Sequence, residues 1–132
     1  MFKKLFSGNS PYTKQARFTA ILWTLLILVG CFWPGDELPK VDVPLADKWV
    51  HFALFGGFAF FWLLARPGGN VKNLLRMFVI SVAFGGSIEI MQGILTFLHR
   101  GMELNDAIAD SIGALIGIGV YSGGWKIAGG EA

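Results

Sequence analysis

The sequence predicts an all-α polytopic membrane protein, folded as a compact bundle of four transmembrane helices. Of its 132 residues, 54% are hydrophobic and only 15% are charged, whereas charged residues make up about 25% of an ordinary soluble domain. The mean hydropathy is +0.57. Proline and glycine residues separate the long apolar runs. A soluble chain of this length would leave large apolar patches in water.

Four apolar runs are the candidate spans, at residues 18–33, 49–65, 74–98 and 107–121. A bilayer core about 30 Å thick needs roughly 20 helical residues at a rise of about 1.5 Å each. The third run is therefore long enough, and the other three become so with their flanks. We expect a single membrane domain over residues 1–132.

Proline and glycine separate these runs where loops are needed. Pro34 and Gly35 end the first run, and Pro39 and Pro44 keep the following segment extended. The sequence Pro-Gly-Gly-Asn at 67–70 is a turn between the second and third runs. The connections are short, as expected for adjacent antiparallel helices.

The N-terminal part of the chain has two further features. Ser10 and the proline after it are a possible start for an amphipathic entry helix, with Lys14 and Arg17 reaching towards lipid headgroups. Residues 28–31 read Leu-Val-Gly-Cys, like the end of a lipoprotein signal sequence. Because two aromatic residues continue the apolar run after Cys31, the preferred interpretation of this cysteine is a small buried hydrophobe.

The single cysteine and the placement of charge limit the class of protein. One cysteine allows neither an internal disulfide nor a cysteine-based zinc site. With four spans, eight of the eleven Lys and Arg residues lie on the side of both termini, and three lie on the other. The eight are Lys3, Lys4, Lys14, Arg17, Arg66, Lys72, Arg76 and Lys126; the three are Lys40, Lys48 and Arg100. The positive-inside rule then places both termini in the cytoplasm.

Acidic residues show the opposite distribution. The predicted outer side has Asp36, Glu37, Asp42, Asp47, Glu103 and Asp106, the spans contain Glu89 and Asp110, and the terminal side has Glu131. We expect no nucleic-acid partner, because the basic residues lie in short loops where anionic lipid accounts for them.

Asp47 and His51 begin the second span at a spacing that places both side chains on one helical face. Such a pair is a candidate acid–base unit with an oriented histidine. The alternative is structural, with Asp47 capping the helix N-terminus and His51 lying at the membrane interface.

Glu89 and Gln92 lie within the third span, beside the glycines at 85, 86 and 93. Glu89 is roughly nine residues from the outer end of its run, which is about 13 Å by helical rise. An intramembrane carboxylate needs a partner or a proton, so Glu89 is a candidate functional residue. The alternative is a structural hydrogen bond between helices.

Asp106, Asp110, Gly113 and Gly117 recur on one face at the start of the fourth span. The two carboxylates lead into a glycine stripe that allows close helix packing among the spans, and Gly119 with the glycine at 123 repeats the spacing. Asp106 alone is equally typical of a helix cap.

All of these polar residues fall in the predicted outer half of the membrane. We expect an outward-facing polar pocket in which Glu89, Arg100, Asp106 and Asp110 form one network, with His51 at its rim. The candidate acid–base residues are Glu89, His51 and Asp47; the candidate ligand-binding residues are Lys48, Gln92, Arg100, Asp106 and Asp110.

The same residues resemble the pattern of the VanZ-like family. The resemblance covers residues 47–117 and rests on Asp47-Lys48 with His51 and Phe52, on Glu89-x-x-Gln92, and on Arg100 followed by Asp106 and Gly113. The chain departs from the pattern at Asp110, where the family usually has Asn. The resemblance implies a protein of the bacterial inner membrane with a role in the envelope and in tolerance of glycopeptide or lipoglycopeptide antibiotics of the teicoplanin type, but no particular reaction.

The sequence is compatible with three functions. In the first, the pocket handles an anionic envelope lipid or lipid-linked precursor, or a lipoglycopeptide, with Lys48 and Arg100 on the phosphate. Because acids outnumber bases there, an anionic ligand would need to be protonated or to bind with a divalent cation. No motif for such a cation is present, so no cofactor is predicted. In the second, the polar network is structural and the protein is a non-catalytic scaffold. The third, a proton-coupled carrier, needs more than four spans or an oligomer.

A serine hydrolase is not expected, because neither Ser87 nor Ser111 lies in a nucleophile-elbow pattern.

Topology can be tested by cysteine labelling in a Cys31→Ala chain. We expect a membrane-impermeant maleimide to label Lys40→Cys in intact cells, and to label Asn70→Cys only after permeabilisation. Equal protection of both positions in intact cells would overturn the arrangement.

Overall fold

The computed structural model describes residues 1–40, 42–43 and 45–130. The described residues form helices and loops and no strand: α1 (Phe2–Leu5), α2 (Thr13–Cys31), the 3-10 turn η1 (Gly35–Glu37), α3 (Ala46–Ala65), α4 (Val71–Ile94), the 3-10 turn η2 (Thr96–Leu98) and α5 (Leu104–Ile127). Pro44 and Glu131, which entered the sequence-based predictions, lie outside the described residues.

Four of the helices, α2, α3, α4 and α5, are long and apolar enough to cross a membrane. The prediction of an all-helical bundle with four spans is therefore confirmed, but the helix ends differ from the apolar runs. Each helix begins three to five residues before its run, and α5 continues to Ile127 instead of ending at residue 121. Polar first turns lower a hydropathy score without ending a helix, which explains the early starts.

The helix starts and stops have local causes. The side chain of Asn70 accepts a hydrogen bond of 2.8 Å from the amide of Asn73 and caps α4. α4 ends at Ile94, four residues before the predicted limit, because η2 forms there instead. No separate entry helix begins at Ser10, since Lys14 already lies in the first turn of α2.

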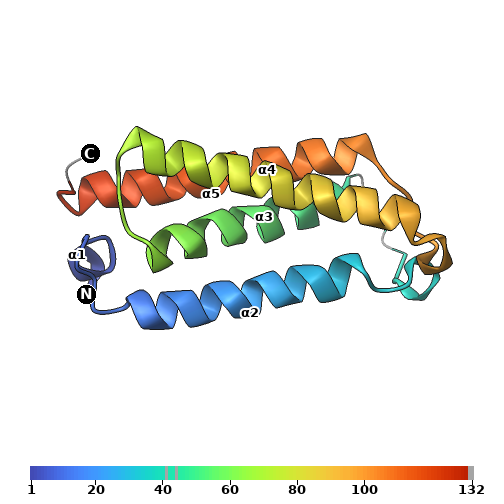
Figure 1. Cartoon of the computed structure of the whole chain (residues 1–132), viewed down its shortest axis with the longest axis horizontal. Coiled ribbons are helices and arrows are strands. Elements are labelled where there is room, and N and C mark those ends of the chain that lie inside the picture. Colours follow the sequence, from blue (N-terminus) through green and yellow to red (C-terminus); the bar gives the residue numbers. More distant parts are fainter. Residues whose placement is uncertain (41, 44, 131–132) are drawn as a thin grey trace.

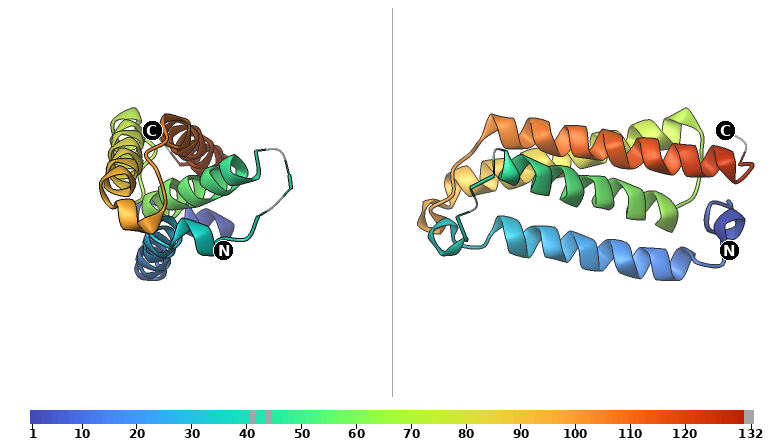
Figure 2. Two further views of the ribbon diagram at one scale, coloured as in Figure 1. Left: turned by 90° about the vertical axis from the view of Figure 1, so that its right-hand side faces the viewer. Right: turned by 180° about the vertical axis from the view of Figure 1, so that it is seen from behind.

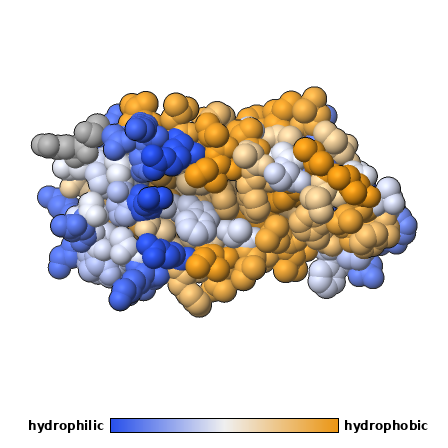
Figure 3. Space-filling model, in the orientation of Figure 1, coloured by the Kyte–Doolittle hydropathy of each residue, from blue (hydrophilic) through white to orange (hydrophobic). Residues whose placement is uncertain are grey.

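The four long helices run antiparallel in sequence order, so both termini lie at one end of the bundle (Figures 1 and 2). We call this the terminal end; it also has the 66–70 turn. The opposite end, which we call the loop end, has residues 32–40, 42–43, 45 and 95–103. Figure 3 shows an apolar band across the molecule, with hydrophilic side chains gathered towards its two ends. This is the surface expected of a bundle in a bilayer.

The helix α3 is central, because it packs against α2, α4 and α5. Its contact with α2 relies on Gly57, where a side chain would collide with the ring of Trp23. The indole Nε1 of Trp23 donates a 2.7 Å hydrogen bond to the carbonyl of Leu54. Cys31 at the end of α2 is 4% exposed, which agrees with a buried hydrophobe.

The closest approach is between α3 and α5. A Cβ added at Gly113 would lie 2.8 Å from the Cα of Phe52, and one added at Gly117 would collide with the backbone of Gly56. The predicted packing at Gly113 and Gly117 is therefore seen. The prediction for the second pair was wrong, since nothing lies within 4 Å of a Cβ added at Gly119 or at the glycine of position 123.

This difference supplies a matched test of helix packing. Glycine to alanine gains about 1 kcal/mol of helix propensity at either position. We expect Gly117→Ala to lower the stability by about 1–3 kcal/mol, because the added methyl group displaces the backbone of α3. Gly119→Ala should be neutral or stabilising. Thermal unfolding in detergent measures both, and equal stability of the two variants would contradict the packing.

Candidate functional site

The candidate site lies at the loop end, where three helices bring polar side chains together. Lys48 and His51 lie in the first two turns of α3, and Asp106 and Asp110 in the first two turns of α5. Glu89 comes from the last third of α4. The close contact at Gly113 places the starts of α3 and α5 side by side, so their side chains face each other.

The most enclosed polar contact joins His51 to Asp110. The imidazole Nδ1 lies 2.5 Å from Asp110 Oδ1, and the Asp110 side chain is 1% exposed. The imidazole Nε2 lies 3.6 Å from Asp106 Oδ2, and both of these side chains are about 15% exposed. A carboxylate at Nδ1 favours a proton on that nitrogen. The Nε2 atom is then the one that faces the rim of the site.

Gly85 makes room for this buried carboxylate. A Cβ added at Gly85 would lie 2.8 Å from Asp110 Oδ2, so the backbone of α4 lies against the aspartate with no side chain between them. Asp110 Oδ2 is buried and has no hydrogen-bond partner among the described residues. Among the described residues, the Asp110 carboxylate therefore has one hydrogen-bond partner, the imidazole of His51.

Lys48 is surrounded by carboxylates. Its ammonium group lies 2.7 Å from Asp47 and 3.4 Å from Glu103, and it also forms an ion pair with Asp106. Asp47, Glu103 and Asp106 could together hold a cation, since one carboxylate oxygen from each lies within 4.8 Å of the others. A divalent cation would compete there with Lys48 and would need to displace it.

Glu89 connects α4 to the start of α5. Its Oε2 accepts a 2.9 Å hydrogen bond from the backbone amide of Glu103, the residue before the first turn of α5. A carboxylate at a helix N-terminus interacts favourably with the helix dipole. Glu89 is 1% exposed, and its Oε1 has no partner among the described residues.

Gln92 and Arg100 hold the end of α2 instead of the centre of the site. Gln92 donates a 2.7 Å hydrogen bond to the carbonyl of Cys31. Arg100 donates to the same carbonyl at 3.3 Å and to that of Gly30 at 3.0 Å. Helix C-termini present carbonyls that lack partners within the helix, and a cation is favourable there.

These contacts correct two predicted pairings. His51 does not pair with Asp47 on its own helix; its carboxylate is Asp110 of α5, while Asp47 binds Lys48. Arg100 does not pair with Glu89, because helix carbonyls take its donors. The predicted network is therefore divided into a His51–Asp110 pair, a Lys48 cluster and the Glu89 contact. Asp106 acts as a partner of Lys48 and not as the cap of α5.

Sequence reasoning missed Glu103, which lies in both the Lys48 cluster and the Glu89 contact. Its position just before the apolar run of α5 was the available signal, since backbone amides there need acceptors.

Outside the spans, His99 Nδ1 lies 3.1 Å from Asp36 Oδ1. The hydrogen bond with His99 lowers the pKa of the exposed Asp36 carboxyl.

The hydroxyl groups of Ser87 and Ser111 form hydrogen bonds within their own helices. Ser87 donates to the carbonyl of Ala83 at 2.7 Å, and Ser111 to that of Ala107 at 2.9 Å. Neither hydroxyl is hydrogen-bonded to His51 in the described part of the chain. The geometry gives no support for a serine nucleophile.

The comparison with protein families gives a match to the VanZ/LLP1 model over residues 4–127. The chain belongs to the VanZ/LLP1 family. The match is wider than the resemblance noted over residues 47–117, because it includes α2 and all of α5. Family membership and four apolar helices together make this a multi-pass membrane protein of the VanZ family. No curated protein and no solved structure matches the chain.

The Glu89 contact can be tested by stability. We expect Glu89→Ala to lower the stability by about 1–3 kcal/mol, because it leaves the amide of Glu103 without its buried acceptor. Glu89→Gln should cost less, since the amide oxygen can still accept that hydrogen bond. Thermal unfolding in detergent measures both, with Ile90→Ala on the exposed face of α4 as a control. An Ala variant as stable as the Gln variant would contradict the contact.

Proposed function

We propose that this VanZ-family protein acts in the bacterial envelope and contributes to tolerance of glycopeptide and lipoglycopeptide antibiotics of the teicoplanin type. The proposed working part is an acid–base site at the loop end, formed by His51 with Asp110. The observation that carries this proposal is the 2.5 Å contact between His51 Nδ1 and a carboxylate that is 1% exposed. Family membership supports the envelope role.

The geometry supports a defined role for each group. The buried Asp110 orients the imidazole through Nδ1, which leaves Nε2 at the accessible rim to accept or donate a proton. Asp106 lies 3.6 Å from Nε2 and limits the directions from which a ligand can approach. Glu89 has a structural role in the proposed site, because it holds the start of α5 and its side chain is too buried to contact a ligand directly.

The charges at the rim favour a ligand that carries hydrogen-bond donors or a positive charge. The cations expected to hold a phosphate are engaged, Lys48 by three carboxylates and Arg100 by helix carbonyls. We therefore propose a lipid-linked envelope precursor or a lipoglycopeptide that presents an amine to the site. A phosphate held by Lys48 and Arg100 stays a prediction that these contacts do not favour.

The proposed orientation places the loop end outside the cell and both termini in the cytoplasm. Eight of the eleven basic residues lie on the side of the termini, which supports it. With this orientation His51 faces the compartment in which glycopeptide antibiotics meet the envelope.

A scaffold role is the second candidate, and specific contacts favour it. Gln92 and Arg100 fix the end of α2, while Glu89 fixes the start of α5, so part of the polar network has structural partners. In this alternative the loop end binds a partner protein, and His51 contributes only packing. The two candidates differ in what a neutral replacement of His51 does.

His51→Gln tests the acid–base site, because glutamine retains hydrogen bonding but cannot exchange a proton near neutral pH. We expect the variant to accumulate as folded protein, and to lower teicoplanin tolerance to the level of the empty vector in a host where the parent chain confers it. Asp110→Asn should retain partial tolerance, since its amide oxygen can still accept from Nδ1.

Ser87→Ala is the matched control, because it removes an exposed hydroxyl that bonds only within α4. It should retain the tolerance of the parent chain. Full tolerance in a folded His51→Gln variant would refute the acid–base site and leave the scaffold role.

A further inference from the structure

Another feature of the structure lies towards the terminal end of the bundle, away from the histidine. A cavity of about 640 Å³ opens between α2 and α4, with α3 behind it. Its volume is in the range of small-molecule binding sites. α2 packs mainly against α3, so it leaves this side of the bundle open towards the surrounding lipid.

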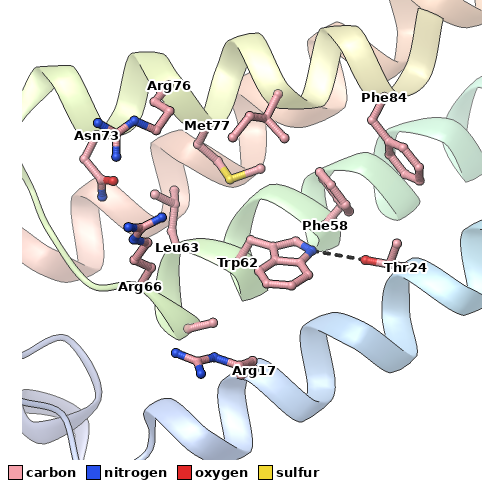
Figure 4. Close-up of a pocket in the computed structure, with 12 residues that line it drawn as sticks. Arg17, Thr24, Phe58, Trp62, Leu63, Arg66, Asn73, Arg76, Met77 and Phe84 are labelled. Carbon is pink, nitrogen blue, oxygen red and sulfur yellow. Dashed lines mark hydrogen bonds between the residues drawn. The ribbon is translucent and has the colours of Figure 1, made fainter. Parts of the chain in front are cut away.

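The inner wall of the cavity is apolar. Phe58, Trp62, Met77 and Phe84 line it (Figure 4). The polar groups in this wall are already paired, since Trp62 Nε1 donates a 3.1 Å hydrogen bond to Thr24 Oγ1. A wall of this kind can bind a hydrocarbon chain, because such a chain has no hydrogen-bonding groups.

Three guanidinium groups gather at one end of the same cavity. Arg17 comes from α2, Arg66 follows α3, and Arg76 comes from α4 (Figure 4). All three are exposed, and within residues 1–40, 42–43 and 45–130 none of them forms an ion pair. The lining contains no acidic residue.

We propose that this cavity binds an anionic glycerophospholipid, with its phosphate among Arg17, Arg66 and Arg76 and an acyl chain along the apolar wall. Arginine binds phosphate oxygens through pairs of parallel hydrogen bonds. A lipid can enter sideways from the bilayer, because Arg17, Arg76 and Ile80 at the edge of the cavity are exposed.

The charge arrangement distinguishes this site from general attraction to headgroups. Any basic residue near the bilayer surface attracts anionic lipid. Here three arginines from three separate segments converge on one apolar cavity. The inference is independent of the acid–base site, which lies at the opposite end of α3.

The test is a lipid titration of the purified full chain in detergent, with binding measured by thermal stabilisation and native mass spectrometry. We expect dioleoylphosphatidylglycerol to bind roughly tenfold more tightly than dioleoylphosphatidylcholine, because the arginines act on its net charge. Inorganic phosphate at the same concentration should give no stabilisation, since it lacks the acyl chain. Equal affinity for the two lipids would overturn the proposal.

Two triple variants separate the site from overall charge. Replacing Arg17, Arg66 and Arg76 by Gln should abolish the preference for phosphatidylglycerol. Replacing Lys3, Lys4 and Lys126 by Gln removes the same charge from exposed positions outside the cavity and should retain the preference. An equal loss in both triple variants would overturn the proposal.

Two further arms complete the design. If the arginine triple variant does not fold, Arg17→Gln and Arg76→Gln singly should each weaken phosphatidylglycerol binding. Undecaprenyl phosphate tests a lipid carrier as the occupant, and tighter binding of this carrier than of phosphatidylglycerol would overturn the assignment to a glycerophospholipid. His51→Gln should bind phosphatidylglycerol like the parent chain, so this test and that of the acid–base site can fail separately.

Discussion

The close contact between α3 and α5 determines where the ionisable groups of this protein lie. Helices in lipid gain little from the hydrophobic effect, so close packing of backbones becomes an important source of association. Gly113 lies against the backbone of His51 and Phe52, one turn along α5 from Asp110. With the two helix starts this close, His51 reaches Asp110 and Lys48 reaches Asp106. A larger residue at position 113 would separate both pairs.

The attachment of α2 explains why the two ends of the bundle differ. At the loop end Gln92 and Arg100 bind the last carbonyls of α2 and hold this helix to α4 and the loop after it. Further along, Trp23 attaches α2 to α3. No comparable polar contact joins α2 to α4 at the terminal end in the described residues, and the apolar cavity opens there. One helix is thus fixed at one end and separated from its neighbour at the other.

The sequence predicted the helices and one packing face correctly, but it did not predict the partners of the charged groups. Hydropathy identifies spans because burial in lipid depends on composition, and the small residues at Gly113 and Gly117 indicate a close contact. Partner choice depends on which helices meet. Asp47 and His51 have the spacing of a pair within one helix, yet Asp110 on α5 is better enclosed. Arg100 lies on the same side as Glu89, but the carbonyls that end α2 take its donors.

The distribution of charge between the two ends sets what each end can bind. At the loop end Lys48 is paired with carboxylates and Arg100 donates to helix carbonyls, so neither is available to hold an added anion beside His51. At the terminal end Arg17, Arg66 and Arg76 face an acid-free lining. In the proposed orientation the positive-inside rule accounts for arginine at this end, but it does not require three arginines to converge on one cavity. Acidic residues influence topology weakly, so they can collect at the loop end without opposing insertion. The bundle can therefore present opposite charge to the two surfaces of one membrane.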